Sequence, residues 1–234
     1  MSARRDSRAG ADLGLVVFDM DGTLVDSQHM ILAAMTHAFD RAGHPPPGRV
    51  DILGIVGLSL PEAMAVLAPN LPPAETLRLA EHYREVSITR REAGEEIAPL
   101  YPGARAALDR LAADTSLVLG VATGKARRGL DHVLALHDLG GHFVTLQTAD
   151  HHPSKPHPSM LLSALAETGL VAERAVMVGD TEFDMAMGKA AGFATIGVAW
   201  GYHPRARLAA AGADRVIEDF AELDAALTAI RGWP

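Results

Sequence analysis

Two aspartates near the start of the chain have the types and spacing for metal-assisted chemistry. Asp19 and Asp21 follow an apolar run, residues 15–18, that is typical of a buried parallel strand. Carboxylates at the C-terminal end of such a strand can face the crevice where open α/β sheets bind ligands. Paired carboxylates suit a hard cation such as Mg²⁺, and a carboxylate beside a metal can also act as a nucleophile. The alternative interpretation is a strand followed by an ordinary polar turn.

A second group of polar residues follows another apolar run, residues 117–122. Thr123, Gly124 and Lys125 offer a hydroxyl and backbone amides that can hold a phosphate oxygen near a helix N-terminus. The alternative is that Thr123 only caps a strand-to-helix turn.

A third candidate is Lys155, which stands between Ser154 and Pro156. Pro156 and Pro158 restrict the backbone here, so we expect Lys155 to be presented on a rigid loop near solvent. A lone lysine is usually a solvated surface group, which is the alternative.

Acidic residues end a further apolar run, residues 175–178. If the chain turns helical here, Asp180 and Asp184 lie one turn apart and on the same side. The alternative is that Asp180 caps this helix. His151, His152 and His157 are a further candidate, for a zinc site, but no carboxylate or cysteine completes a convincing soft-metal set, and the sequence favours surface or loop histidines.

Asp19 to Ser27 resembles the first motif of the haloacid dehalogenase superfamily, specifically of its phosphatase members. The resemblance implies that Asp19 attacks phosphorus, and that Asp21 is a general acid/base whose backbone carbonyl binds Mg²⁺. Thr123 matches the second motif, which binds the transferring phosphoryl group. Lys155 matches the third motif, whose ammonium neutralises charge between nucleophile and phosphate.

The acidic stretch resembles the fourth motif of the same superfamily. Asp180 is then a direct Mg²⁺ ligand, and Asp184 lies behind the ligands, where it orients a metal-bound water or Lys155. The implied metal set of Asp19, Asp21 and Asp180 is oxygen-only and suits Mg²⁺ rather than Zn²⁺. Dehalogenases of the superfamily lack the second aspartate, so its presence points to phosphate-ester chemistry.

The predicted function is a Mg²⁺-dependent phosphatase that hydrolyses a small phosphate monoester through an aspartyl-phosphate. Phosphoglycolate phosphatases look most similar, followed by enzymes that act on nucleotides, sugar phosphates or pyrophosphate. The sequence is also compatible with a β-phosphoglucomutase-like phosphomutase and, less so, with a catalytically silent binding protein. The candidate substrate contacts are Gly22, Thr123, Gly124, Lys125 and Lys155, with Gly57, Ser59 and more weakly His29 from the inserted segment. Ser59 alternatively only caps a helix.

The elements that must position these residues alternate along the chain. Apolar runs predict strands at residues 15–18, 117–122, 143–146, 175–178 and 195–198. Helices are expected at 104–112, 129–136, 159–168, 184–191 and 221–230. This alternation predicts an α/β fold with a doubly wound, mostly parallel sheet.

The segment from residue 27 to residue 96 shows helical spacing and no strong strand. We therefore expect a small helical cap, inserted after the first strand of a core formed by residues 13–26 and 97–234. Residues 1–12 are expected to be a flexible tail.

Composition limits the remaining possibilities. The 234 residues are 48% hydrophobic and 21% charged, which is typical of a globular protein. A net charge of −8 argues against a nucleic-acid or anionic-membrane partner, and the lack of cysteine excludes disulfides and thiolate sites. No apolar run is long enough to span a bilayer. We expect a cytoplasmic monomer or homodimer that acts on a small phosphorylated metabolite.

Lysine is rare in this chain, because arginine supplies most of its 21 basic residues. The three lysines are Lys125, Lys155 and Lys189, and all lie within or beside the motifs. A lysine kept against this bias indicates a position where arginine does not serve; the alternative, chance placement on a solvated face, applies to Lys189.

Overall fold

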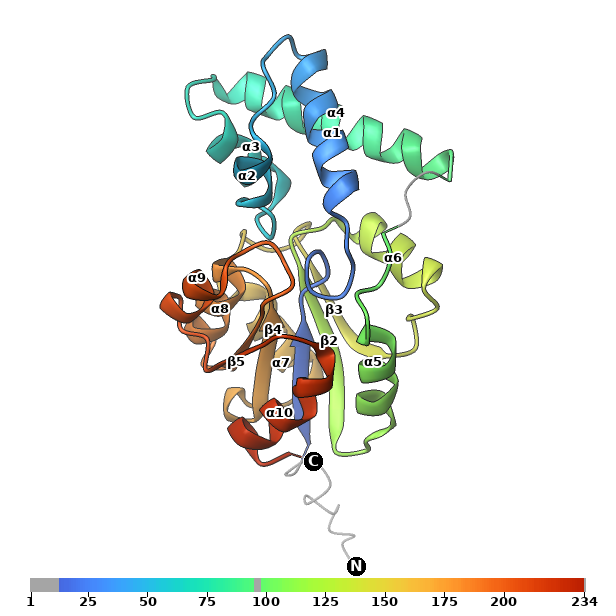
Figure 1. The fold of residues 1–234 in the computed structure, drawn as a ribbon, viewed down its shortest axis with the longest axis vertical. Helices are drawn as coiled ribbons and strands as arrows, with labels where there is room; N and C mark the ends of the chain where they lie inside the picture. The colour runs from blue at the N-terminus through green and yellow to red at the C-terminus, as the bar shows by residue number, and fades with distance from the viewer. Residues whose placement is uncertain (1–12, 95–97, 234) are drawn as a thin grey trace, which may run out of the picture.

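The computed structural model describes residues 13–94 and 98–233 and contains one six-stranded parallel sheet, shown in Figure 1. Its strand order is β3-β2-β1-β4-β5-β6, with every neighbouring pair parallel. The strands are β1 (Gly14–Phe18), β2 (Leu117–Thr123), β3 (Phe143–Thr148), β4 (Ala175–Gly179), β5 (Ala194–Val198) and β6 (Arg215–Ile217). The predicted fold class and the five predicted strands are confirmed. The sixth strand was not predicted because it is only three residues long and begins with an exposed arginine.

Helices cover both faces of the sheet, as a doubly wound fold requires. They are α5 (Ala104–Ala113), α6 (Arg127–Leu136), α7 (Ser159–Thr168), α8 (Glu182–Ala190), α9 (Arg205–Ala210) and α10 (Leu223–Arg231), with short 3-10 helices η1 (Ala172–Arg174) and η2 (Phe220–Glu222). Successive side chains of β1 point to opposite faces of the sheet. Val16 and Phe18 pack with α5, α6 and α10, whereas Leu15 and Val17 pack with α7 and α8.

Four further helices lie together beyond the C-terminal ends of the strands (Figure 1). They are α1 (Gln28–Arg41), α2 (Arg49–Leu53), α3 (Leu60–Leu67) and α4 (Pro73–Glu92), and we call this group the cap. The cap has a hydrophobic cluster of its own, with Met35, Ile52, Met64 and Leu79 fully or almost fully buried. It lies within the segment predicted as an inserted helical domain, whose limits stay a prediction. The predicted tail, residues 1–12, lies outside the described residues.

The chain leaves the sheet for the cap and returns to it at adjacent points. Val25 and Leu100 form an antiparallel bridge, and the Asp26 N–H donates to the Pro99 carbonyl at 2.8 Å. Within the described ranges, no helix has the length and apolar character needed to cross a membrane.

The loop between α2 and α3 packs directly on the sheet end of the molecule. The Ser59 N–H donates to Ser154 Oγ at 2.8 Å. His203 accepts the Glu182 N–H at Nδ1 (3.1 Å), so its Nε2 carries the proton and donates to the Gly54 carbonyl at 3.2 Å. These bonds join the cap to the core, so the structure shows the cap closed over the strand ends.

Candidate active site

The sheet order brings three of the predicted site segments to one place. Asp19 follows β1, Asp180 follows β4 and Thr123 ends β2, and these strands are neighbours in the order β2-β1-β4. The Asp19 N–H donates to the Val178 carbonyl at 2.9 Å and so continues the pairing beyond β1. Side chains that lie far apart in the sequence therefore meet at the carboxyl edge of the sheet, where such folds bind ligands.

Lys155 lies at the centre of a buried cluster of charges. Its Nζ donates to Asp19 Oδ1 at 2.8 Å and to Asp184 Oδ1 at 2.6 Å. Carboxylate oxygens of Asp19, Asp180 and Asp184 all lie within 4.8 Å of one another. The Lys155 side chain is fully buried, so the expectation that it stands near solvent is wrong. Its two carboxylate partners compensate for the lost hydration of the ammonium.

Asp180 is fixed by bonds from two loops. Thr23 Oγ1 donates to Asp180 Oδ1 at 3.0 Å, and the Tyr202 N–H donates to Oδ2 at 2.9 Å. The backbone at Gly22 and Gly201 passes so near this carboxyl group that a Cβ at either position would collide with it. Gly22 also has φ +84°, which favours glycine, and its N–H is bonded to the Val25 carbonyl.

Asp184 is held at the start of α8, where Thr181 and Asp184 form a capping box. Asp184 Oδ2 accepts the Thr181 N–H at 3.0 Å and the Thr181 hydroxyl at 2.6 Å. Its other oxygen accepts from Lys155. Both oxygens of Asp184 are therefore bonded within the protein, and this arrangement orients the Lys155 ammonium. Thr181, not Asp180, is the N-cap residue of this helix.

The cluster carries more negative than positive charge. Burial raises the pKa of Asp19 to about 7; Lys155 opposes this rise, while Asp184 and Asp21 add to it. Burial also raises the pKa of Asp180, with further contributions from Asp184 and Asp19. Burial alone would lower the pKa of Lys155, but Asp184 and Asp19 outweigh it and the net shift is upward. The single ammonium of Lys155 therefore does not balance the negative charge of the buried carboxylates.

Two carboxylate oxygens of the site have no partner among the described residues. Asp19 Oδ2 and Asp21 Oδ1 are buried and accept no hydrogen bond. A buried, unpartnered carboxylate oxygen is costly unless a cation or donor reaches it. The surplus of negative charge and the all-oxygen donor set fit a hard divalent cation such as Mg²⁺.

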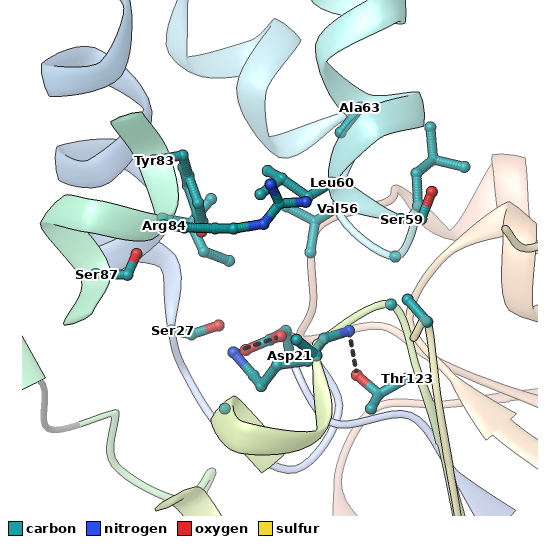
Figure 2. Close-up of a pocket in the computed structure, with 18 of the residues that line it drawn as sticks. Asp21, Ser27, Val56, Ser59, Leu60, Ala63, Tyr83, Arg84, Ser87 and Thr123 are labelled. Atoms are coloured by element: carbon teal, nitrogen blue, oxygen red, sulfur yellow. Dashed lines mark hydrogen bonds and ion pairs between the residues drawn. The ribbon is translucent and has the colours of Figure 1, made fainter. Parts of the chain in front are cut away.

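A cavity of about 810 Å³ separates the cap from the core (Figure 2). Predicted site residues that line it are Asp19, Asp21, Gly57, Ser59, Thr123, Gly124 and Lys125. Lys155, Asp180 and Gly22 are not among its lining residues; Lys155 and Asp180 are buried, and Gly22 packs against Asp180. His29 is exposed and also outside the lining.

Lys125 forms an ion pair with Asp21. Its Nζ lies 3.0 Å from Asp21 Oδ2, and its N–H donates to Thr123 Oγ1 at 3.2 Å. Ser59 occupies the N-cap position of α3 but its side chain makes no capping hydrogen bond. The Lys125–Asp21 ion pair was not predicted; the spacing of the two segments gives no sign of it.

The cap loop approaches the core most closely at Gly124. A Cβ at this position would lie 2.6 Å from the carbonyl oxygens of both Gly57 and Leu58. We expect Gly124→Ala to prevent this closed position and to lower kcat/KM by about tenfold or more, as misplacement of positioning groups does. Steady-state kinetics and a thermal melt measure the effect. Gly140→Ala is the control, since a Cβ there meets nothing within 4 Å; equal kinetics of the two variants would contradict the expectation.

The sequence analysis gave no role to several residues that shape the site. Thr23 and Tyr202 hold Asp180, and Thr181 holds Asp184. Tyr202 follows shortly after the predicted strand at residues 195–198, and this position near a strand end could have marked it as a candidate site residue. Arg84 lines the cavity from α4, and nothing in its sequence surroundings marks it.

The fold and this arrangement of carboxylates, lysine and threonine agree with a comparison to known families. Residues 16–198 match the family model described as haloacid dehalogenase-like hydrolase. The chain belongs to this family, and the expectation that it is a hydrolase of this kind is confirmed.

The chain is similar to several curated relatives over most of its length. A probable phosphatase IndB of Dickeya dadantii is 35% identical over 92% of this chain and 94% of the relative. A pyrophosphatase PpaX of Bacillus velezensis is 32% identical over 89% and 93%. A phosphoglycolate phosphatase of Pseudomonas fluorescens is 30% identical over 89% and 78%. Among solved structures, a hydrolase from Pseudomonas syringae superposes with a TM-score of 0.81, at 25% identity, over 93% of this chain and 99% of that one.

Proposed function

We propose that this protein is a Mg²⁺-dependent phosphatase that hydrolyses a small phosphate monoester through an aspartyl-phosphate on Asp19. One observation carries the proposal. Asp19 is among the residues that line the cavity, and one of its carboxylate oxygens is buried without a partner among the described residues, while the other oxygen accepts from the buried Lys155 ammonium. A carboxylate fixed in this way is pre-oriented to attack an electrophile that enters from the cavity.

The two steps follow from the residues around Asp19. An Asp19 oxygen bonds to phosphorus as the bond to the leaving oxygen breaks, and Asp21 gives that oxygen a proton. In the second step Asp21 takes a proton from water, whose oxygen bonds to phosphorus and displaces Asp19. Lys155, the Thr123 hydroxyl and the backbone amide of Gly124 would stabilise the phosphoryl oxygens.

We propose that oxygen donors at this edge of the sheet hold the metal. Asp19, the Asp21 backbone carbonyl and Asp180 would hold Mg²⁺, with Asp184 positioned behind them through Lys155 and Thr181. When bound, the ion neutralises developing charge on the phosphoryl group.

Removal of the metal tests this assignment. We expect exhaustive chelation to stop turnover, since the buried carboxylates alone repel a phosphate dianion, and added Mg²⁺ to restore it. Phosphate release before and after dialysis against a chelator is the measurement, with added Zn²⁺ as a comparison. Full activity of the metal-free protein would overturn the assignment.

The relatives suggest the range of substrates. Phosphoglycolate, sugar phosphates and nucleotide phosphates are the monoesters to test first, because one relative is named as a phosphoglycolate phosphatase. Pyrophosphate is the second candidate, because another relative is named as a pyrophosphatase. A screen of phosphate release over such a panel with Mg²⁺ tests the proposal. A phosphomutase would instead isomerise glucose phosphate without free phosphate, and a binding protein would turn over none of the compounds.

We retain the expectation of a cytoplasmic monomer or homodimer. The absence of cysteine is compatible with a reducing compartment, and a net charge of −8 disfavours nucleic acid and anionic membranes as partners. The choice between monomer and homodimer stays a prediction.

A further inference from the structure

We propose that Arg84 binds a second anionic group, a carboxylate or phosphoryl group, on the leaving-group part of the substrate. The inference rests on the proposed function and narrows its substrate class to esters that carry two anionic groups.

Arg84 reaches into the cavity from the cap. Figure 2 shows its side chain extending from α4 toward Val56 and Leu60, with its guanidinium on the opposite side of the cavity from Asp21 and Thr123. A phosphate held beside Asp19 and Thr123 therefore directs its leaving group into the space that Arg84 borders. The cation is placed for the far part of the substrate, not for the reacting phosphoryl group.

The guanidinium has no partner within the described part of the protein. Among the described residues, Arg84 makes no hydrogen bond and no ion pair. The adjacent Glu85 is used elsewhere, since it pairs with Arg41 at 3.2 Å and contacts His82 at 3.4 Å. A guanidinium offers five donors in a planar fork that matches carboxylate and phosphate oxygens. Arg84 is an exposed residue that borders the cavity, and its unpaired guanidinium is suited to an anion supplied by the ligand.

Several other charged residues that line the cavity have partners of their own. Lys125 is paired with Asp21 at 3.0 Å, and Arg128 reaches Glu92 at 3.5 Å. The acids that line the cavity are Asp19, Asp21, Glu62 and Asp150. Asp19 accepts from Lys155, Asp21 pairs with Lys125, and Asp150 accepts the Arg127 N–H. None of the four acids, Glu62 included, is bonded to Arg84.

The cavity has room for such a leaving group. Its volume of about 810 Å³ lies within the range of about 300–1,000 Å³ typical of small-molecule sites. Its cap wall is largely apolar and includes Ile31, Val56, Leu60 and Ile88. Apolar walls weaken the screening of charge, which strengthens a pairing between Arg84 and an anion.

Matched substrates isolate the second anion. One arm compares phosphate esters of ω-hydroxy acids, over a series of chain lengths, with the corresponding primary amides. The other arm compares alkanediol bisphosphates with the monophosphates of the same diols. We expect the wild-type protein with Mg²⁺ to show a higher kcat/KM for the doubly anionic member of at least one pair, mainly through KM. The arm with the larger preference identifies the group as carboxylate or phosphoryl.

Arg84→Gln should reduce that preference by about 10- to 100-fold, the range for loss of a hydrogen bond to a charged group. Arg84→Lys should retain part of it, because the charge remains while the fork is lost. Arg78→Gln is the matched control on α4: Arg78 pairs with Glu75 at 3.3 Å and does not line the cavity. A thermal melt of each variant checks that it folds.

The Arg84 assignment and the proposed function fail on different outcomes. If wild type releases phosphate from the amides and the acids at equal rates and shows no preference for the bisphosphates, the Arg84 assignment is overturned while the proposed function stands. A preference that survives intact in Arg84→Gln also overturns the assignment. If wild type releases phosphate from none of these esters or of the wider panel, the proposed function itself is overturned, and the assignment with it.

Discussion

Asp19→Asn is expected to abolish phosphate release while leaving the fold intact. An amide cannot form the acyl-phosphate on which the proposed reaction depends. The variant should be at least as stable as the wild type without metal, because Asp19 is one of three buried carboxylates and its burial raises its pKa to about 7. Removing the charge relieves part of this desolvation cost.

Three measurements check this expectation. Phosphate release gives the loss of turnover, and a thermal melt gives the stability. Mass spectrometry of acid-quenched enzyme should find one added phosphoryl group at Asp19 in the wild type and none in the variant. Asp40→Asn, at an exposed position of α1, is the control and should retain activity. Undiminished release by Asp19→Asn would remove the nucleophile assignment.

Lys155→Arg is expected to lower kcat by about 10²-fold or more, the range seen when one preorganised donor is lost. The charge is preserved, so the effect comes from shape. A compact ammonium fits between Asp19 and Asp184, with N–O distances of 2.8 and 2.6 Å. A planar guanidinium is wider and favours bidentate pairing with one carboxylate, which would shift Asp19 from its position.

Stability should fall as well, by about 1–3 kcal/mol, because the larger group enters a fully buried position. This replaces the expectation from the sequence that the site lies near solvent and that stability changes little. Kinetics and a chemical denaturation curve give both quantities. Lys189→Arg is the control, since Lys189 pairs with Asp214 at the surface and should tolerate the exchange. A kcat near that of the wild type would mean that Lys155 is only a distant positive charge.

The sheet was predictable because its strands are buried on both faces and so read as continuous apolar runs. All five predicted strands and five core helices appear within two residues of their expected ends. β6 and α9 were missed because a three-residue edge strand and a six-residue helix carry too little pattern.

The catalytic candidates were predictable for a different reason. Asp19, Thr123 and Asp180 each follow an apolar strand, and neighbouring parallel strands bring such residues to one edge. The burial of Lys155 was not predictable, because it depends on contacts with residues 29 and 136 positions away. Arg84 lies among charged residues of α4, where the sequence favours a solvated face; only the fold shows that a cavity lies beneath it.

The adjacent exit and return of the chain at Val25 and Leu100 divide the molecule into two parts with separate tasks. The carboxylates and Lys155 belong to the loops and helix that follow the strands of the sheet, whereas Arg84, Gly57 and Ser59 belong to the excursion between those two residues. Under the proposed function, we expect substitutions, insertions or exchange of that excursion to alter which ester is accepted while the reacting groups stay in place. We therefore expect the same reacting groups to act on new substrates when the cap is replaced. The bridge between Val25 and Leu100 marks the point at which two such proteins could exchange caps.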